Sequence, residues 1–404
     1  MNRRSFLRLG AGAALAAVNW RLWAAPTGGS NGRFLLVFLR GAYDALSAVV
    51  PYAEPFYYEA RPHIALARPS ERDPDAVIAL DGRWGLNPAL QDSLLPLYEA
   101  GELAFVPFAG TAFVSRSHFQ AQDWIEFGHA PGTQPNPNSG FLNRLLAQLG
   151  AGGGRRPDAV SFTRTLPPVL RGGLPVANTP VRVANRRRIS AGYEALLEEM
   201  YAGHPLEPMV RDGLSLRREI SKELAEEMQT ASRDALPASG FALEAARIGR
   251  LLRDRPEYNI GFIDIGGWDT HAAQGAARGA LSGRLHDLGE GLAELAEALG
   301  PEWKRTVVVV MSEFGRTFRE NGSKGTDHGH GSTLWVLGGS VRGGAIRGEQ
   351  APLGPGDLHQ NRDLPVLNEY RATLAGLFAR LYGLDGQALA EVFPQARPID
   401  LGLV

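Results

Sequence analysis

The sequence predicts an α/β fold built on a parallel sheet. Strand, helix and strand patterns alternate along the chain, which favours parallel strands joined by helices. The strongest strand patterns, Phe34 to Leu39 and Val307 to Val310, are unbroken apolar runs, as expected of strands buried on both faces. Polar clusters adjoin the predicted strands, and binding sites form at strand ends in open parallel sheets.

The first strand–helix–strand unit lies near the N-terminus. After strand 34–39, Asn87-Pro88 predicts a helix start, because asparagine caps helices and proline favours the first turn. Gly101 ends this helix, and Leu103 to Pro107 is the next predicted strand. The apolar stripe of the helix consists of Leu90, Leu94, Leu97 and Tyr98.

The C-terminal half predicts strands at Tyr258 to Ile265, Thr306 to Met311 and Thr333 to Leu337. A regular leucine stripe between the first two predicts a long helix, which Gly300-Pro301 ends. Its leucines are Leu281, Leu285, Leu288, Leu292, Leu295 and Leu299. A last helix carries Leu374, Leu377, Phe378 and Leu381.

The middle of the chain has weaker patterns. Asp158 to Phe162 predicts a strand, and residues 208–232 and 239–254 predict charged helices. We therefore interpret residues 165–255 as an insertion or cap on one α/β domain that spans residues 34–404.

The N-terminus has the layout of a twin-arginine export signal, predicted over residues 1–25. Paired arginines in Asn2 to Arg8 precede the apolar stretch Leu9 to Val18, and Ala24-Ala25 closes the segment. The stretch is shorter than the roughly 20 residues that span a bilayer. Residues 26–33 predict a linker, so we expect a periplasmic or secreted protein with no integral membrane anchor after cleavage.

Composition excludes several functional classes. The 404 residues contain no cysteine, which rules out thiolate metal sites and cysteine nucleophiles. Removing the four arginines of residues 1–25 takes the net charge from −1 to about −5, so we expect no nucleic-acid partner. The one Gly-x-Ser-x-Gly segment, Gly28 to Gly32, lies in the predicted linker and not between a strand and a helix, and the chain lacks a phosphate-binding P-loop. Both observations argue against an ordinary α/β-hydrolase and an NTPase.

Four polar clusters hold the candidate functional residues. They are Arg40-Gly41-Ala42-Tyr43-Asp44, Gly266-Gly267-Trp268-Asp269-Thr270-His271, Ser312-Glu313-Phe314-Gly315-Arg316 and Asp327-His328-Gly329-His330-Gly331-Ser332. The first three follow predicted strands and the fourth precedes one. Carboxylates and imidazoles suit zinc, or manganese if oxygen ligands dominate. Asp and His in glycine-rich loops are also common as turn formers, and that alternative stays open.

Glu313 follows a very apolar strand and precedes Phe314-Gly315-Arg316. A carboxylate there is costly unless it is paired or coordinated. One interpretation is an ion pair with Arg316 or Arg40. The other is a metal ligand, with Arg40 or Arg316 as the clamp on a substrate anion.

Ser117 lies at the predicted start of a helix, where backbone amides favour anions. Its hydroxyl beside a metal could attack phosphorus or sulfur. Ser117 and Gln120 also match a capping box. His118 is interpreted either as a nearby base or as a plain surface residue.

The clusters together resemble a bacterial family of twin-arginine-exported proteins of unassigned function in the alkaline phosphatase and sulfatase superfamily. The matching segments are Leu39 to Leu46, Ser117-His118-Phe119 with Gln122-Asp123, Gly266 to His271, Ser312 to Thr317 and Asp327 to Gly331. The resemblance implies a three-layer αβα fold with a mostly parallel sheet and one or two bound divalent metals. Zinc is favoured, with manganese, calcium or magnesium as alternatives.

The resemblance also implies roles for single residues. Ser117 takes the place of the nucleophile, and the expected substrate is a small-molecule or polymer ester of phosphate or sulfate. The metal ligands by position are Asp44, Asp269, His271, Glu313 and either His328 or His330. The twin-arginine export machinery is the expected partner.

Departures from the superfamily pattern leave a second hypothesis open. A single residue separates Asp269 from His271, fewer than the superfamily usually has, and Phe314 stands where a histidine ligand is expected. One metal site therefore looks weakened, which favours a mononuclear site. It also leaves open a non-enzymatic binding or assembly protein of the cell envelope that kept the fold.

Overall fold

The computed structural model describes residues 32–130, 132–134, 136–151, 157–180, 199–204, 207 and 230–404. The predicted export signal, most of the linker and most of the predicted helix 208–232 lie outside the described residues. No helix in the described part of the chain is long and apolar enough to cross a bilayer.

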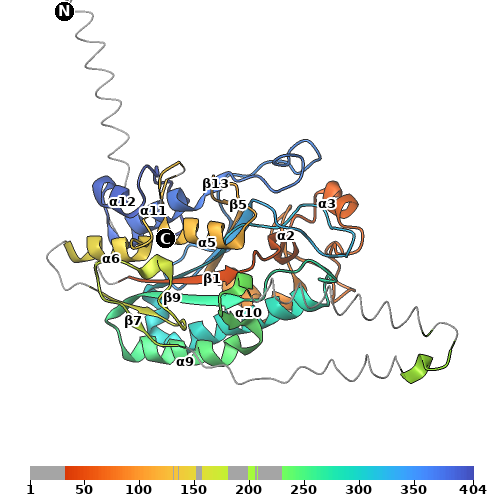
Figure 1. Cartoon of the computed structure of the whole chain (residues 1–404), viewed down its shortest axis with the longest axis horizontal. Coiled ribbons are helices and arrows are strands. Elements are labelled where there is room, and N and C mark those ends of the chain that lie inside the picture. The colour runs from red at the N-terminus through yellow and green to blue at the C-terminus, as the bar shows by residue number, and fades with distance from the viewer. Residues whose placement is uncertain are drawn as a thin grey trace, which may run out of the picture.

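A large sheet runs through the middle of the molecule, with helices on both sides (Figure 1). Its central strand β1 (Arg33–Arg40) lies between β9 (Tyr258–Gly266) and β10 (Thr306–Ser312), and both pair with it in parallel. Every residue of β1 and β10 is buried, so their unbroken apolar patterns follow from burial on both faces.

The strand order is β12-β5-β11-β10-β1-β9-β6-β7, with β13 paired to β5 and β8 to β9. β11 (Ser332–Leu337) runs antiparallel to β10 and to β5 (Leu103–Gly110), and the other pairs are parallel. The prediction of a mostly parallel sheet is thus confirmed. The shorter strands are β6 (Asp158–Ser161), β7 (Ala177–Asn178), β8 (Leu236–Pro237), β12 (Ala345–Ile346) and β13 (Asn368–Glu369).

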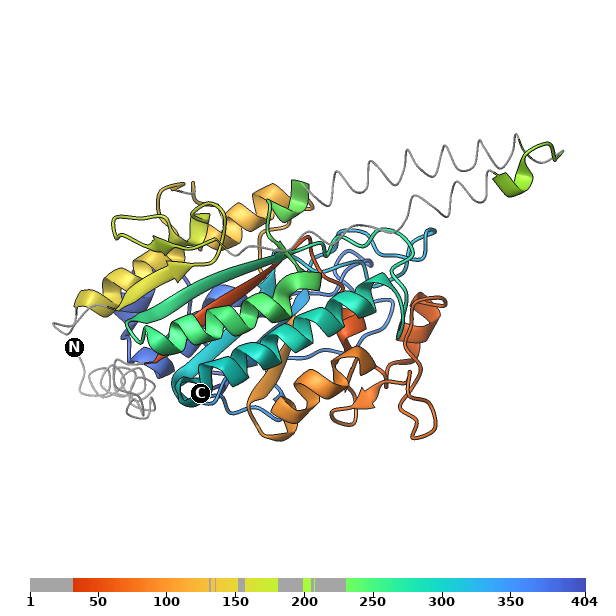
Figure 2. The ribbon, with the colours of Figure 1, turned by 90° about the horizontal axis from the view of Figure 1, so that it is seen from below.

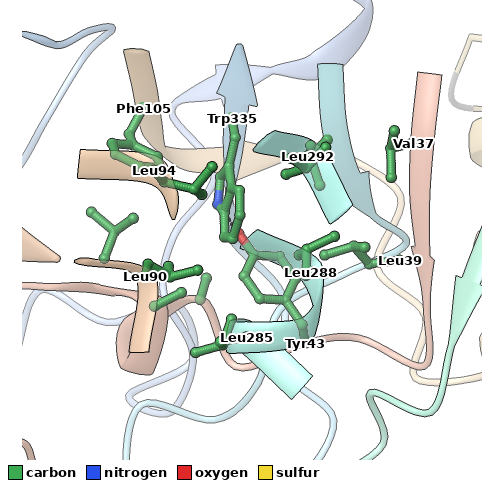
Figure 3. Close-up of a cluster of buried hydrophobic side chains, with 14 of the residues drawn as sticks. Val37, Leu39, Tyr43, Leu90, Leu94, Phe105, Leu285, Leu288, Leu292 and Trp335 are labelled. Atoms are coloured by element: carbon green, nitrogen blue, oxygen red, sulfur yellow. Dashed lines mark hydrogen bonds between the residues drawn. The ribbon is translucent and has the colours of Figure 1, made fainter. Parts of the chain in front are cut away.

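Alternate residues of β1 enter two different cores, which makes the fold three-layered. Val37 and Leu39 pack in one core with α4 (Gln91–Glu99), α9 (Phe241–Asp254) and α10 (Ala280–Leu299). Figure 2 shows α9 and α10 side by side along this face, and Figure 3 shows leucines of α10 packed near β1 and Trp335 of β11.

The other face of β1 meets the second helix layer. Phe34, Leu36 and Phe38 pack in a core with α6 (Phe141–Ala151), α11 (Tyr370–Tyr382) and α12 (Gly386–Val392). Helix α5 (His118–Phe127) contributes Ile125 to this core. The α/β class expected from the sequence is therefore confirmed, with helices on both sides of the sheet.

The predicted elements begin and end close to their expected positions. Asn87 caps a single 3-10 turn, Pro88–Leu90, by accepting a hydrogen bond from the amide of Ala89, and α4 follows. Gly300 ends α10. The remaining short elements are α2 (Ala45–Ala48), β2 (Val49–Val50), α3 (Pro55–Ala60), β3 (Ile78–Ala79), β4 (Gly85–Leu86), and the 3-10 turns Pro168–Leu170, Ala238–Gly240 and Gly300–Arg305.

The stretch 165–255 is described only in part. Within it, β7 and β8 join the main sheet and α9 packs against α10. Its interpretation as an insertion or cap stays a prediction.

Candidate metal centre

The parallel register of β1, β9 and β10 brings three loops together at the carboxyl ends of the strands. Leu39 pairs with Ser312, and Arg40 pairs with Gly266, so the three strands end at the same level. Gly41 has φ +113°, and a Cβ there would lie 2.9 Å from the amide nitrogen of Asp269. Glycine therefore allows the turn after β1 to pack directly against the loop after β9.

A fourth loop carries His328 to the same place. The segments around Arg316 and His328 form an antiparallel bridge, and the amide of Gly329 donates to the carbonyl of Gly315 at 2.8 Å. A Cβ at Gly329 would lie 2.4 Å from the backbone of Arg316. The glycine beside His328 thus serves a close backbone approach.

Three imidazoles and one carboxylate converge between these loops. His328 Nε2 lies 2.9 Å from His118 Nε2 and 3.0 Å from His271 Nε2. Asp269 Oδ1 lies 2.8 Å from His271 Nε2 and 3.2 Å from His328 Nε2, and Asp269 Oδ2 lies 3.5 Å from His118 Nε2. We call these four residues the His–Asp cluster.

The opposite nitrogen of each ring faces a hydrogen-bond acceptor outside the cluster. The contacts are His118 Nδ1 to Glu313 Oε1 at 2.7 Å, His328 Nδ1 to Arg116 O at 2.9 Å, and His271 Nδ1 to Asp327 Oδ1 at 3.4 Å. Carboxylates and carbonyls accept protons, so in neutral rings the proton sits on Nδ1 and the lone pair on Nε2. Metal-binding histidines are usually oriented in this way.

Asp269 supplies the oxygen donor of the cluster. Its Oδ1 accepts from Arg316 Nη1 at 2.5 Å, whereas its Oδ2 is buried and has no hydrogen-bond partner among the described residues. An unsatisfied buried carboxylate oxygen is costly. Burial raises the pKa of Asp269, but the three histidines and Arg316 outweigh burial and hold that pKa far below its ordinary value.

These donors fit a divalent cation. Ligands 2.0–2.1 Å from a tetrahedral zinc ion lie about 3.3 Å apart, close to the contacts in the cluster, and imidazole nitrogens with a carboxylate oxygen suit zinc. His118, Asp269 and His328 are the one set of potential ligands found to converge within 4.8 Å in the described part of the chain. Burial lowers the pKa of His118, but Asp269 and Glu313 raise it to about 9, so without metal a proton provides the positive charge.

Asp44, expected as a ligand, is engaged elsewhere. Its two oxygens accept from Arg61 at 2.6 and 3.0 Å, and Oδ2 also accepts from Ser47 and Gln274. The structure does not bring Asp44 into the His–Asp cluster, because the arginine after α3 folds back onto it.

Glu313 also differs from its expected role. In the described part of the chain, its carboxylate forms no hydrogen bond or ion pair with Arg40 or Arg316. Instead its Oε1 accepts from the amide of Gly41 at 2.8 Å and contacts the outward nitrogen of His118. Burial raises the pKa of Glu313, but His118 outweighs burial and lowers it to about 2. Glu313 therefore orients a cluster residue from behind.

Neither arginine expected as an anion clamp is available to solvent. Both Arg40 and Arg316 are 2% exposed. Arg40 pairs with Glu126 at 2.8 Å and Asp264 at 2.7 Å, and Arg316 pairs with Asp269. The geometry does not support the clamp predicted for these two residues.

His330 points away from the cluster. Its ring lies 4.6 Å from the ring of His359. Burial, His359 and Arg116 together lower the pKa of His330 to about 4. Of the two alternatives left open for the last histidine, the geometry favours His328.

Ser117 borders the cluster at the start of α5. Its side chain makes no capping hydrogen bond, and Gln120 instead accepts from Ser115 at 3.0 Å, so the expected capping box is not formed. Ser117 is exposed. Of its two neighbours in sequence, Arg116 contacts the cluster and His118 belongs to it. His118 itself is buried, which excludes the surface interpretation.

The sequence analysis placed Gln122 in a matching segment without a role, and it missed Glu126. His118, Gln122 and Glu126 recur every fourth residue of α5 and are all buried. Gln122 donates to Glu313 Oε1 at 2.9 Å and accepts from Arg40 at 3.0 Å, and Glu126 pairs with Arg40. Polar residues at helical spacing on one helix face were the available signal.

The fold and this centre define a class: α/β proteins with a histidine–carboxylate cluster at the carboxyl ends of parallel strands. The chain belongs to the family described as "Protein of unknown function (DUF1501)", whose model matches residues 31–393. Comparison with curated proteins found no match.

Solved structures of low similarity include a member of the alkaline phosphatase superfamily, a synthase and a sulfatase. A Vibrio parahaemolyticus protein of that superfamily has 9% identity and a TM-score of 0.36, over 78% of this chain and 62% of its own length. The lipoteichoic acid synthase LtaP from Listeria monocytogenes has 10% identity and a TM-score of 0.40, over 94% and 77%. BT1596, a 2-O GAG sulfatase, has 10% identity and a TM-score of 0.38, over 88% and 71%. With identities of 9–10% and TM-scores of 0.36–0.40, these similarities carry no argument about the site or the reaction of this chain.

Proposed function

We propose that this protein is a metal-dependent hydrolase of phosphate or sulfate esters. The observation that carries the proposal is the His–Asp cluster, in which the Nε2 atoms of His118 and His271 and the carboxylate of Asp269 surround His328 Nε2, while each Nδ1 is held from behind. Such an arrangement leaves lone pairs facing one another unless a cation or a proton lies among them. We favour zinc as the metal, with one ion bound per chain.

The residues of the cluster would hold the ion, each with a defined task. His118, His271 and His328 present nitrogen donors, and Asp269 presents an oxygen donor whose charge Arg316 partly balances. A bound divalent cation supplies positive charge that stabilises the negative charge developing on the ester oxygens. Glu313 keeps the Nδ1 proton of His118 in place.

Ser117 is the proposed nucleophile. Its hydroxyl is exposed and free of the capping bond that would occupy it. In the proposed reaction Ser117 Oγ bonds to phosphorus or sulfur, and the alcohol oxygen leaves with the electron pair of the broken bond. The serine proton is delivered to that leaving oxygen through solvent. Water then cleaves the seryl ester, which releases phosphate or sulfate and restores the hydroxyl.

The test combines metal analysis with a panel of phosphate and sulfate esters. We expect close to one zinc per chain after purification without chelator, and turnover of at least one ester. Ser117→Ala should abolish turnover and retain the metal, whereas His271→Ala should lose both. Exposed Ser70 and His286 provide matched controls as Ser70→Ala and His286→Ala.

The proposal would be wrong if the protein purified without chelator contained no metal and hydrolysed none of the esters. Full complementation of a deletion strain by Ser117→Ala and His271→Ala would instead favour the non-enzymatic envelope protein.

The proposal includes export by the twin-arginine route, supported by the paired arginines and short apolar stretch of residues 1–25. We expect a double variant, Arg3→Lys with Arg4→Lys, to stay in the cytoplasm with its signal segment uncleaved. Fractionation of cells expressing either form tests this, with Arg21→Lys as the matched control. Equal export of the double variant would contradict the route.

A further inference from the structure

Two arginines outside the proposed ligand set flank His328. The carbonyl of Arg116 contacts His328 Nδ1 at 2.9 Å, and Arg362 Nη1 donates to the carbonyl of His328 at 2.8 Å. The two arginines come from segments far apart in sequence, yet each contacts the same member of the His–Asp cluster, Arg116 through its backbone carbonyl and Arg362 through its side chain. Arg116 also directly precedes Ser117.

Both guanidinium groups turn toward one carboxylate. Arg362 Nη1 lies 3.1 Å from Asp363 Oδ1, and Arg116 Nη2 lies 3.6 Å from Asp363 Oδ2. The side chain of Asp363 is 2% exposed, whereas those of Arg362 and Arg116 are 33% and 48% exposed. One carboxylate thus balances two cations, and a guanidinium has five N–H donors, so positive charge and donors remain accessible.

The turn that carries Arg362 is held in an unfavourable backbone conformation. Gln360 and Asn361 have φ +52° and +53°, a left-handed region that is uncommon for residues other than glycine. Mutual backbone hydrogen bonds between His359 and Asp363, at 2.9 and 3.0 Å, close the turn. Conformations of this kind often persist at binding sites, where surrounding contacts fix them.

A buried nitrogen in the same turn has no partner in the described part of the chain. His359 Nε2 is inaccessible to solvent and has no hydrogen bond to any described residue, and its ring packs beside His330. Buried polar atoms are normally satisfied. The turn therefore combines the accessible Arg362 with a buried imidazole nitrogen that lacks a hydrogen bond to the described residues.

We propose that Arg116 and Arg362 form a binding site for a tetrahedral oxyanion, phosphate or sulfate, beside the metal centre. Guanidinium groups bind such anions through paired, charge-assisted hydrogen bonds. Asp363 occupies the donors in the absence of the anion and holds the two arginines together. The proposal rests on the proposed function only in naming the anion as part of the substrate.

The test measures binding of inorganic sulfate to the full-chain protein by calorimetry at constant ionic strength. Metal is first removed with a chelator, so that the anion cannot coordinate it. We expect R116Q/R362Q to weaken sulfate binding at least tenfold. The matched control is Arg278→Gln, which removes a remote arginine whose side chain is 80% exposed. Sulfate binding that is equal in the double variant and the unaltered protein would overturn the proposal.

A second variant predicts the opposite change. Asp363→Asn removes the carboxylate that competes with the anion, so sulfate should bind several-fold more tightly, with folding checked by thermal unfolding. Unchanged or weaker binding in a folded Asp363→Asn protein counts against the site.

The two proposals fail separately. Arginine-dependent sulfate binding without turnover of any ester by the metal-loaded protein removes the hydrolase and leaves the anion site. Turnover of an ester, together with sulfate binding that is the same with and without the two arginines, removes the anion site and leaves the hydrolase. If the protein is active, a raised KM for simple monoesters in R116Q/R362Q assigns the site to the cleaved group. A raised KM confined to esters with a second anionic group assigns it to that second group.

Discussion

At the scale of single residues, Asp269 has the contacts that decide whether the cluster binds metal. One of its oxygens is satisfied by Arg316, and the other is buried without a hydrogen bond among the described residues. The side chain is therefore stable only with positive charge nearby, from the histidines or from an ion. Asparagine at this position would keep the shape and remove the charge.

We expect Asp269→Asn to lower zinc affinity by a factor of ten or more, because the neutral amide is a far weaker ligand for zinc than a carboxylate. Competition with a fluorescent zinc chelator measures the effect. Asp92→Asn, at an exposed position of α4, is the control and should bind zinc normally. Equal affinities in the two variants would exclude Asp269 as a ligand.

Gln122 links the cluster to the buried Arg40 network. Its amide donates to Glu313 and accepts from Arg40, and Glu313 in turn orients His118. Because partners behind metal ligands commonly change metal affinity about 10–100-fold, we expect Gln122→Leu to lower zinc affinity within that range while the protein stays folded. Gln120→Leu, on the exposed side of the same helix, should leave the affinity unchanged. A Gln122→Leu protein with full affinity would show that the link has no role in orienting His118.

The residue scale also shows why part of the site could not be predicted. His328 and His330 are two positions apart, and a sequence pattern gives both the same chemistry. The structure separates them, because one faces the cluster and the other faces His359. Asp44 has the right position after β1, but its neutralisation by Arg61 depends on how the chain returns after α3. These outcomes follow from tertiary contacts that no local pattern contains.

At the scale of elements, local patterns were sufficient for the strongest strands and the longest helix. The apolar runs of β1 and β10 and the leucine stripe of α10 predicted elements that are present nearly residue for residue. Such patterns are reliable because burial imposes them on each element separately. These patterns could not predict that β11 runs antiparallel to its neighbours, because a buried strand has the same composition in either direction.

We expect Leu292→Ala in α10 to lower the free energy of unfolding by about 2–5 kcal/mol, because the side chain is fully buried and truncation leaves a cavity. Leu243→Ala in the neighbouring helix α9 is a matched control, since Leu243 is 58% exposed. The control should change stability by about 0.5 kcal/mol or less. Urea unfolding monitored by circular dichroism measures both, and similar losses in the two variants would contradict this packing of α10 against the sheet.

At the scale of the whole molecule, the pair formed by Asp44 and Arg61 joins distant parts of the chain. Asp44 follows β1, Arg61 follows α3, and Arg61 also donates to the carbonyls of Thr317 and Phe318 in the loop after β10. Both side chains are buried. Burial raises the pKa of Asp44, but Arg61 outweighs burial and holds that pKa below its ordinary value. In this network the guanidinium of Arg61 neutralises the buried carboxylate of Asp44, the part that a metal ion or a proton plays in the His–Asp cluster.

This pair predicts how the stability of the whole fold depends on pH. Because the pKa of Asp44 is lower in the folded than in the unfolded chain, its contribution is present above the unfolded value of about 3.9 and is lost as the pH falls through the folded value. In Asp44→Asn that contribution is absent at every pH. We therefore expect the free energy of unfolding of the unaltered protein to exceed that of Asp44→Asn by about 3–5 kcal/mol at pH 7, as for a broken buried ion pair. The difference should shrink as the pH falls below about 4. Urea unfolding in the presence of chelator, at a series of pH values from neutral to acidic, measures the difference without a contribution from bound metal. If the difference in the free energy of unfolding stayed constant down to the lowest pH, the pKa of Asp44 would not change on folding. The ion pair of Asp44 with Arg61 would then not be what joins these three segments.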